Sequence, residues 1–228
     1  MSEKNTAYMK YRELMYRFLS GLFMEEVDRE MLDAMLEMEF PEIDEPGPDG
    51  AADLKAGYEM LAGVLNDFRG KDEQTVNEML EDLAADYAKT FLAAGDASGK
   101  AAFPYESVYT GTDSQFGGSV QMNLNAEYAA RGLFMREDMF KVMEDHVGLE
   151  FNYMAELLKE QEELLEAGEE KKADKLSKDQ KKFFRRHIIN WVNLFANDIY
   201  KYTERDFYKS IARLTIGFIE SEQKLIQG

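Results

Sequence analysis

The sequence contains no cysteine, one tryptophan, two histidines and only four prolines among its 228 residues. Without cysteine the chain can form no disulfide framework, no thiolate metal site and no cysteine nucleophile. Uninterrupted apolar runs are also missing, so the sequence predicts neither a secretory signal nor a membrane-spanning helix. These absences are compatible with the cytoplasm, which is the compartment we predict, and they leave little room for metal or thiol chemistry.

Charge of one sign dominates what is present. The chain has 45 acidic and 27 basic side chains, for a formal net charge of −18. Such a surface repels nucleic acid phosphates and anionic lipids, and it attracts basic partners. The single basic stretch, residues 171–186, is interleaved with acids and is typical of a solvated helix face. We therefore expect no nucleic acid partner, no stable membrane insertion and a partner that is cationic or neutral.

Apolar residues recur at steps of three and four along most of the chain, and no segment alternates with period two. The sequence predicts an all-α fold, a single compact bundle of about eight to ten helices that forms one domain over residues 1–228. We expect the first helix to stop at Gly21 and Asp72 to cap a later one. The expected helices are Thr6 to Leu19, Val27 to Phe40, Asp53 to Phe68, Asp72 to Leu92, Val120 to Gly132, Asp138 to Leu165, Phe183 to Tyr200 and Phe207 to Leu225.

Two loops interrupt the helical pattern. The first, "PEIDEPGPDG" at residues 41–50, concentrates three of the prolines. The second, a long hinge-like loop near residues 93–119, separates an N-terminal half of about residues 1–93 from a C-terminal half of about residues 120–228. Because such a hinge permits two copies to exchange halves, both a monomer and a domain-swapped homodimer remain open.

The presence of only two histidines limits acid/base and metal chemistry. His146 follows Asp145 and precedes Glu150 by four residues, so a helix here would place the imidazole and the Glu150 carboxylate on one face. This set leaves open a small helical metal- or nucleotide-dependent hydrolase, although a structural histidine held by a carboxylate is more common.

The di-iron pattern Glu-x-x-His fails, because Met143 and Phe184 stand three positions before the two histidines. Nucleotide-binding glycine motifs are also missing. We predict no catalytic residue, no metal and no cofactor, and a scaffold subunit with a methionine-rich interface is a further alternative.

Five segments in order resemble the TorD/DmsD family of molybdoenzyme chaperones: "LAADYAKTFLAAG", "FPYESVYTG", "EYAARGLF", "EDHVGLEFNYMAELL" and "FFRRHIINWVNLF…TERDFYKSIARLTIGFI". The likeness covers about residues 80 to 220, and the first eighty residues fit only in being helical and acidic. The family's proline-aromatic-x-S-V-aromatic element matches Pro104, Tyr105, Ser107, Val108 and Tyr109. Its E-P-x-D-H element matches at Asp145 and His146, whereas Val142 and Met143 stand where Glu and Pro are expected.

The resemblance implies a cytoplasmic, all-helical maturation chaperone that is not an enzyme. Its partners would be the twin-arginine signal peptide and the apo-form of the catalytic subunit of a molybdopterin-dependent oxidoreductase, such as a DMSO or TMAO reductase. The chaperone would hold this client back from export until the cofactor is inserted.

A twin-arginine leader offers two guanidinium groups followed by an apolar segment, so its receptor needs carboxylates beside an apolar groove. We predict that Glu106, Asp145 and Glu150 supply the carboxylates. An aromatic loop that only plugs the bundle is the structural alternative for the tyrosines, and the two roles are compatible. The other predicted peptide-binding residues are Tyr87, Phe91, Pro104, Tyr105, Ser107, Tyr109 and His146.

Overall fold

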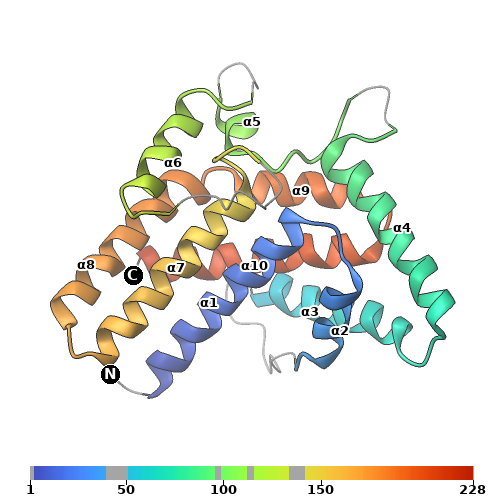
Figure 1. The fold of residues 1–228 in the computed structure, drawn as a ribbon, viewed down its shortest axis with the longest axis horizontal. Coiled ribbons are helices and arrows are strands. Elements are labelled where there is room, and N and C mark those ends of the chain that lie inside the picture. Colours follow the sequence, from blue (N-terminus) through green and yellow to red (C-terminus); the bar gives the residue numbers. More distant parts are fainter. Residues whose placement is uncertain (1–2, 40–50, 96–98, 112–115, 134–141, 228) are drawn as a thin grey trace. The chain divides into compact units, whose positions relative to one another are not determined.

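The computed structural model describes residues 3–39, 51–95, 99–111, 116–133 and 142–227 (Figure 1). Within these ranges the chain forms ten α-helices and one short π-helix, with a single isolated β-bridge and no strand. The predicted all-α fold class is confirmed. The helices are α1 (Glu3–Met24), α2 (Arg29–Glu37), α3 (Ala51–Phe68), α4 (Glu73–Leu92), α5 (Glu106–Thr110), α6 (Ser119–Ala129), α7 (Val147–Glu166), α8 (Glu170–Phe183), the π-helix η1 (Phe184–Ile188), α9 (Val192–Tyr202) and α10 (Asp206–Gln227).

The chain folds into two compact units that are interleaved along the sequence. Unit 1 comprises Met1–Met24 and Pro104–Trp191, and unit 2 comprises Glu25–Phe103 and Val192–Gly228. The chain therefore passes from one unit to the other at three points of the sequence. A single domain over residues 1–228, with halves that meet at loop 94–119, stays a prediction.

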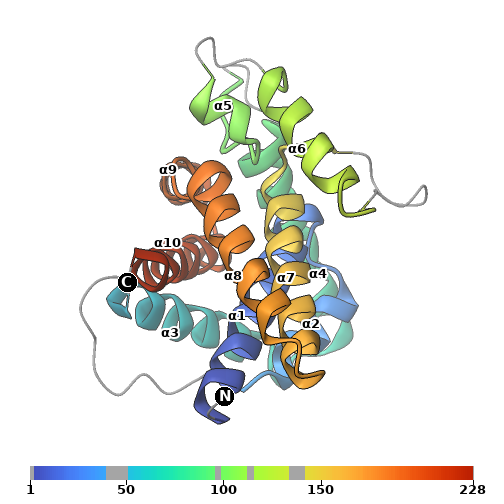
Figure 2. The same cartoon turned by 90° about the vertical axis from the view of Figure 1, so that its left-hand side faces the viewer.

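Unit 1 is built on α1, α7 and α8. Helices α1 and α7 run antiparallel and side by side (Figures 1 and 2), so Ser20 near the end of α1 donates to the carbonyl of Gly148 at the start of α7 over 2.7 Å. The two helices approach closely here, because a Cβ at position 148 would lie 2.5 Å from Cγ of Met24. The ring of Tyr16 packs edge-on against Phe151 at 5.5 Å between centroids, and both side chains are fully buried. Unit 1 thus has its own apolar core.

Unit 2 is built on the antiparallel pair α3 and α10, which lie side by side in Figures 1 and 2. Gly57 is buried where they cross, and a Cβ there would lie 2.7 Å from the backbone nitrogen of Leu214. Helix α4 packs along α9 in the same unit. Asp72 caps α4 as predicted, accepting from the Thr75 amide over 2.9 Å.

Three of the expected helices differ from the structure in ways that have a physical explanation or shift a boundary by several residues. Helix α1 continues past Gly21 to Met24, because one mid-helix glycine costs only about 1 kcal/mol, which packing can offset. The helix expected from Asp138 begins at Val147, after a non-helical stretch at residues 142–146. The helix expected over residues 183–200 is interrupted, since the side-chain amide of Asn190 donates hydrogen bonds to the carbonyls of Arg185 and Arg186 over 3.1 and 3.3 Å.

The first predicted loop, residues 41–50, lies wholly outside the described residues, and the second, residues 93–119, lies partly outside them. Outside them lie residues 40–50, 96–98 and 112–115, and also residues 134–141 of the expected central helix. Within the described part of the stretch at 93–119, residues 106–110 form α5. Within the described residues, no helix combines the length and apolarity needed to span a bilayer.

Candidate functional site

The candidate site begins where two loop segments of unit 1 pair like neighbouring strands. Tyr105 and His146 form an isolated antiparallel β-bridge. Beside it, the Glu106 amide donates to the Asp145 carbonyl over 2.9 Å. The structure thus joins the two sequence elements "FPYESV" and "EDHV", which are about forty residues apart.

Further hydrogen bonds fix this junction. The amide of Val147 donates to the carbonyl of Pro104 over 2.9 Å, and the amide of Ser107 donates to Oδ2 of Asp145 over 3.1 Å. The Ser107 hydroxyl in turn accepts from the amide of Gly117 over 2.8 Å. Each partner is a backbone group or a short side chain, so the register between the two segments is tightly specified.

Glu106 is the first residue of α5, and its side chain points into the interior of unit 1. The side chain is 5% exposed, and its Oε2 lies 2.9 Å from Nδ1 of His187 in the π-helix η1. The other ring nitrogen, Nε2, lies 3.7 Å from Oε1 of Glu127 on α6, and Glu127 also pairs with Arg186. The imidazole therefore stands between two carboxylates on different helices.

Glu150 on α7 completes a buried acidic cluster. The residue is fully buried, and its Oε2 accepts from Nε1 of Trp191 over 3.3 Å. Burial raises the pKa of Glu150 well above its ordinary value, and the nearby carboxylate of Glu106 raises it further. Glu150 is consequently a neutral acid under conditions in which an exposed glutamate is ionised. The Trp191 ring stacks on Tyr109 of α5, with 5.5 Å between centroids.

His146 is the N-cap of α7 and does not form part of the helix. Its Nδ1 accepts from the amide of Gly148 over 3.1 Å, and its ring meets Tyr105 edge-on at 5.1 Å. Burial lowers the pKa of His146 to about 3, so the imidazole is neutral and its proton sits on Nε2. The expectation that His146 and Glu150 share a helix face is wrong, because the chain turns into the helix only after His146.

Tyr105 and Tyr109 are half-buried, in contrast to the acids around them. The Tyr105 ring also packs edge-on against Phe116 at 5.4 Å between centroids, and Phe116 is 48% exposed. This part of unit 1 therefore offers aromatic surface to solvent directly beside the junction of the two segments.

Tyr87 and Phe91 belong to unit 2. Both are buried in an aromatic cluster, in which Tyr87 and Phe91 lie 4.9 Å apart and Phe91 meets Tyr208 edge-on at 5.5 Å. Phe91 also approaches Phe195 of α9 at 6.0 Å. Their observed contacts are those of core residues in that unit.

The structure brings together eight of the ten predicted residues in unit 1, and it adds two that the sequence reasoning missed. The missed residues are His187 and Trp191, which contact Glu106 and Glu150. The sequence signal that could have identified them is their spacing of four residues, which places the only tryptophan of the chain one helical turn after a histidine. The eight are Pro104, Tyr105, Glu106, Ser107, Tyr109, Asp145, His146 and Glu150.

The geometry does not favour hydrolytic chemistry. The acceptor nitrogen of His146 is already occupied by a backbone amide, and the residue is 3% exposed. No group of three or more His, Cys, Asp or Glu side chains within the described residues could hold a metal ion. What the arrangement retains is acceptor capacity, because Oδ1 of Asp145 is buried and has no hydrogen-bond partner in the described part of the chain.

Comparison with known proteins gives a consistent result. The family model described as the nitrate reductase delta subunit matches residues 51–197. Proteins named chaperone protein TorD from Vibrio parahaemolyticus and Vibrio atlanticus are each 24% identical to this chain, over 97% of its length and 97% of theirs. Chaperone protein TorD from Photobacterium profundum is 23% identical over 77% of this chain and 76% of its own length. These relatives are named as chaperones, in agreement with the prediction that the chain is not an enzyme. The chain therefore belongs to the nitrate reductase delta subunit family, and its predicted membership of the TorD/DmsD chaperones is confirmed.

Proposed function

We propose that the protein is a cytoplasmic maturation chaperone that binds the twin-arginine leader of a molybdopterin-dependent oxidoreductase of the DMSO or TMAO reductase type. It holds the apo-form of that client back from export until the cofactor is inserted. The observation that carries the proposal is the junction of "FPYESV" with "EDHV", which places Glu106 and Asp145 beside the rings of Tyr105 and His146 in a chain related to TorD chaperones.

The apolar segment of the leader docks on the half-exposed aromatic surface of unit 1. Tyr105 and Phe116 form this surface, and their edge-to-face packing holds the two rings in a fixed relative orientation. Aromatic side chains bury a large area with little loss of conformational entropy, which makes them effective anchors for an apolar peptide. The polar end of Tyr105 keeps the surface compatible with water when no leader is bound.

The guanidinium groups of the leader pair with Glu106 and Asp145. Oε2 of Glu106 contacts Nδ1 of His187 in the free protein, and a guanidinium can replace the imidazole. Asp145 uses Oδ2 for the Ser107 amide and has Oδ1 left as an acceptor. Because both acids are at most 4% exposed, α5 has to shift for a guanidinium to enter. Burial raises the pKa of Glu150 and favours its protonated form, so in this proposal Glu150 makes no ion pair with the leader.

Isothermal titration calorimetry with a synthetic twin-arginine leader tests the proposal. We expect a dissociation constant in the micromolar range, which corresponds to a binding free energy of about −8 kcal/mol. Such an affinity suits a chaperone that has to release its client. A peptide with Lys-Lys in place of the arginine pair should bind at least tenfold more weakly, because ammonium groups cannot make bidentate contacts with carboxylates. No binding of the leader, or equal binding of both peptides, would overturn the arginine-reading function.

Two substitutions test the assignment of the site. Glu106→Gln and Asp145→Asn should each weaken leader binding by about tenfold or more, since removing one partner of a buried ion pair costs roughly 2 kcal/mol or more. Glu81→Gln, at an exposed position on α4, removes the same charge and should leave the affinity unchanged. Circular dichroism checks that all three variants stay helical. Unchanged affinity in both site variants would show that the leader binds elsewhere.

A further inference from the structure

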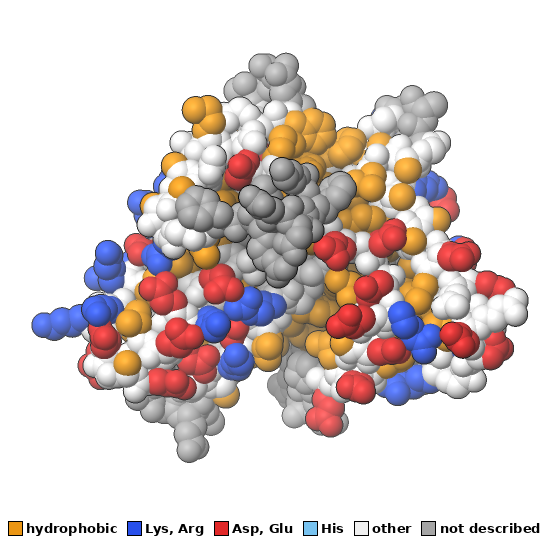
Figure 3. Space-filling model, viewed as in Figure 1, with side chains coloured by type: hydrophobic (Ala, Val, Ile, Leu, Met, Phe, Trp, Pro, Cys, Tyr) orange, Lys and Arg blue, Asp and Glu red, His pale blue; other side chains and the backbone are white. Residues whose placement is uncertain are grey.

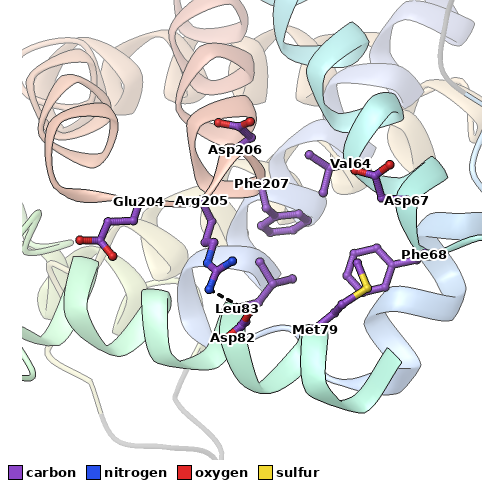
Figure 4. Close-up of a pocket in the computed structure, with 10 residues that line it drawn as sticks. All are labelled: Val64, Asp67, Phe68, Met79, Asp82, Leu83, Glu204, Arg205, Asp206 and Phe207. Atoms are coloured by element: carbon purple, nitrogen blue, oxygen red, sulfur yellow. Dashed lines mark ion pairs between the residues drawn. The ribbon is translucent and has the colours of Figure 1, made fainter. Parts of the chain in front are cut away.

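A concave site lies wholly within unit 2. Its cavity measures about 320 Å³ and opens between the end of α3, the middle of α4 and the turn that joins α9 to α10 (Figure 4). The leader site, formed by Tyr105, Glu106, Phe116 and Asp145 in the proposal above, contributes no residue to the lining of this cavity. The lining residues are Val64, Asp67, Phe68, Met79, Asp82, Leu83, Glu204, Arg205, Asp206 and Phe207.

The wall formed by the α9–α10 turn is fixed by one buried acid. Asp86 on α4 accepts from the amide of Glu204 over 2.9 Å and from the amide of Arg205 over 3.2 Å. The hydroxyl of Thr203 donates to the same carboxylate. These bonds tie the turn to α4, so the cavity is formed before any ligand arrives, and binding does not require the wall to become ordered.

The floor of the cavity is apolar. Phe68, Leu83 and Phe207 are at most 5% exposed, and Met79 and Val64 are partly exposed beside them. Figure 4 shows Phe207, Leu83, Phe68 and Met79 gathered in the centre of the view. A large apolar side chain fits such a floor, and the flexible thioether of Met79 can adjust to its shape.

The rim of the cavity is acidic. Four acids and one arginine line it, for a net charge of −3, and Figure 3 shows carboxylates spread widely over the part of unit 2 around α2 and α4. Three of the four acids are exposed and have a basic partner: Asp82 pairs with Arg205 at 2.8 Å, Asp206 with Lys209 at 3.0 Å, and Glu204 with Lys89. Exposed pairs of this kind contribute about 0–1 kcal/mol and exchange readily.

Asp67 is the exception. It is exposed and forms no ion pair with any residue that the structure describes. It is also the penultimate residue of α3, whose last turn carries no basic side chain. The C-terminal end of a helix is electronegative, so a carboxylate there is unfavourable until a cation joins it. Arg69, two residues further on, does not supply this cation, because its guanidinium donates to the carbonyl of Leu36 over 2.7 Å.

We propose that this cavity binds a segment of a partner protein in which a basic residue stands next to a large apolar residue. The basic side chain pairs with Asp67 at the end of α3, and the apolar side chain packs on the floor formed by Phe68 and Met79. Arg205 competes with the ligand, because it already holds Asp82 (Figure 4). The inference does not rest on the leader site, whose proposed residues for arginine recognition lie in unit 1.

The test is an NMR titration of the ¹⁵N-labelled full chain with the blocked dipeptide N-acetyl-phenylalanyl-arginine amide. We expect shifts centred on the amides of residues 64–68, 79–83 and 204–207. The glutamate version of the dipeptide should bind at least tenfold more weakly, and the glycyl-arginine version at least threefold more weakly. Shifts that avoid these amides, or equal shifts with the glutamate version, would overturn the proposal.

Three variants give the proposal its sharpest test. Asp67→Asn should weaken binding of the dipeptide at least fivefold, and Arg205→Ala should strengthen it about threefold, because Asp82 is released and the rim becomes more negative. Glu59→Gln removes a similar exposed charge from the same helix, about 12 Å along its axis from Asp67, and should change the affinity less than twofold. An Asp67→Asn variant that binds like the wild type would refute the site. Asp145→Asn, which disables the proposed leader site, should leave this titration unchanged, so the two proposals fail separately.

Discussion

The capping imidazole of His146 should make the protein sensitive to acid. Its pKa is lowered to about 3 in the folded protein, because the ring is buried and accepts a hydrogen bond from the Gly148 amide. In the unfolded chain the pKa is about 6.5. Below that value the unfolded state binds a proton that the folded state does not. The contribution of His146 to stability is therefore complete above pH 6.5 and is lost as the pH falls toward 3.

The size of the effect follows from one pKa unit being about 1.4 kcal/mol. Between pH 7.5 and pH 5.0 the proton linkage of His146 should lower the free energy of unfolding by about 2 kcal/mol, and by about 3 kcal/mol at pH 4. The matched variant is His146→Asn, since asparagine is a favourable N-cap and does not titrate. It should be somewhat less stable at pH 7.5, because a buried ring is lost, and it should lose less stability on acidification.

Urea unfolding followed by circular dichroism at 222 nm, at pH 7.5 and pH 5.0, measures the difference. The wild type should lose about 2 kcal/mol more than His146→Asn between the two pH values. If both proteins lose the same amount, His146 is not held neutral in the folded state, and the hydrogen bond from Gly148 to its ring is wrongly assigned.

Three further predictions concern packing and the buried acids. Gly57→Ala should destabilise the protein by about 1–3 kcal/mol, because its Cβ would meet the backbone of Leu214, whereas Gly63→Ala, with open space around it, should stabilise it by up to about 1 kcal/mol. Thermal unfolding that shifts in the same direction for both would contradict the close α3–α10 contact. Asp86→Ala should cost about 2 kcal/mol or more and increase amide hydrogen exchange in the α9–α10 turn; unchanged exchange there would argue against its anchoring role. Glu150→Gln should be at least as stable as the wild type near neutral pH, with the wild type gaining on it as the pH falls, since a raised folded-state pKa gives stability below about 4.5 that is lost as the pH rises. A variant that is strongly destabilised at pH 7.5 in urea unfolding would indicate an ionised Glu150.

The helices could be predicted from the sequence because their signals are local. The apolar stripe that gives α10 its buried face, and the Asp72 cap of α4, depend only on residues one or two turns apart. The break after the π-helix could not be read in the same way. Asn190 is a weak helix breaker by itself. It ends the helix because its side-chain amide donates hydrogen bonds to the backbone carbonyls of Arg185 and Arg186. The apolar pattern runs on through the break, so periodicity alone predicts one continuous helix.

The candidate site was only partly predictable, because its contacts join residues far apart in the chain. The family resemblance selected "FPYESV" and "EDHV" separately, and nothing in either segment specifies that they pair. The ionisation of the acids is a tertiary property as well. Glu106 and Glu150 look alike in sequence, yet their surroundings differ. Glu106 contacts His187, whereas Glu150 accepts a hydrogen bond from Trp191 and has a pKa that burial raises well above its ordinary value.

For the proposed function, this difference between the acids bears on how a doubly cationic leader would bind and still be released. Three ionised carboxylates in one buried cluster would repel one another in the free protein, and they would hold a cation too tightly for easy release. In the proposed complex, Glu106 and Asp145 would face the two guanidinium groups, while burial favours the protonated form of Glu150. Glu106 contacts His187 in the free protein and would contact a guanidinium in the proposed complex, so it would not be left buried without a partner, which is the costly state for such an acid. The remaining cost is the desolvation of the guanidinium groups and the shift of α5, and it keeps the expected affinity in the micromolar range and not tighter.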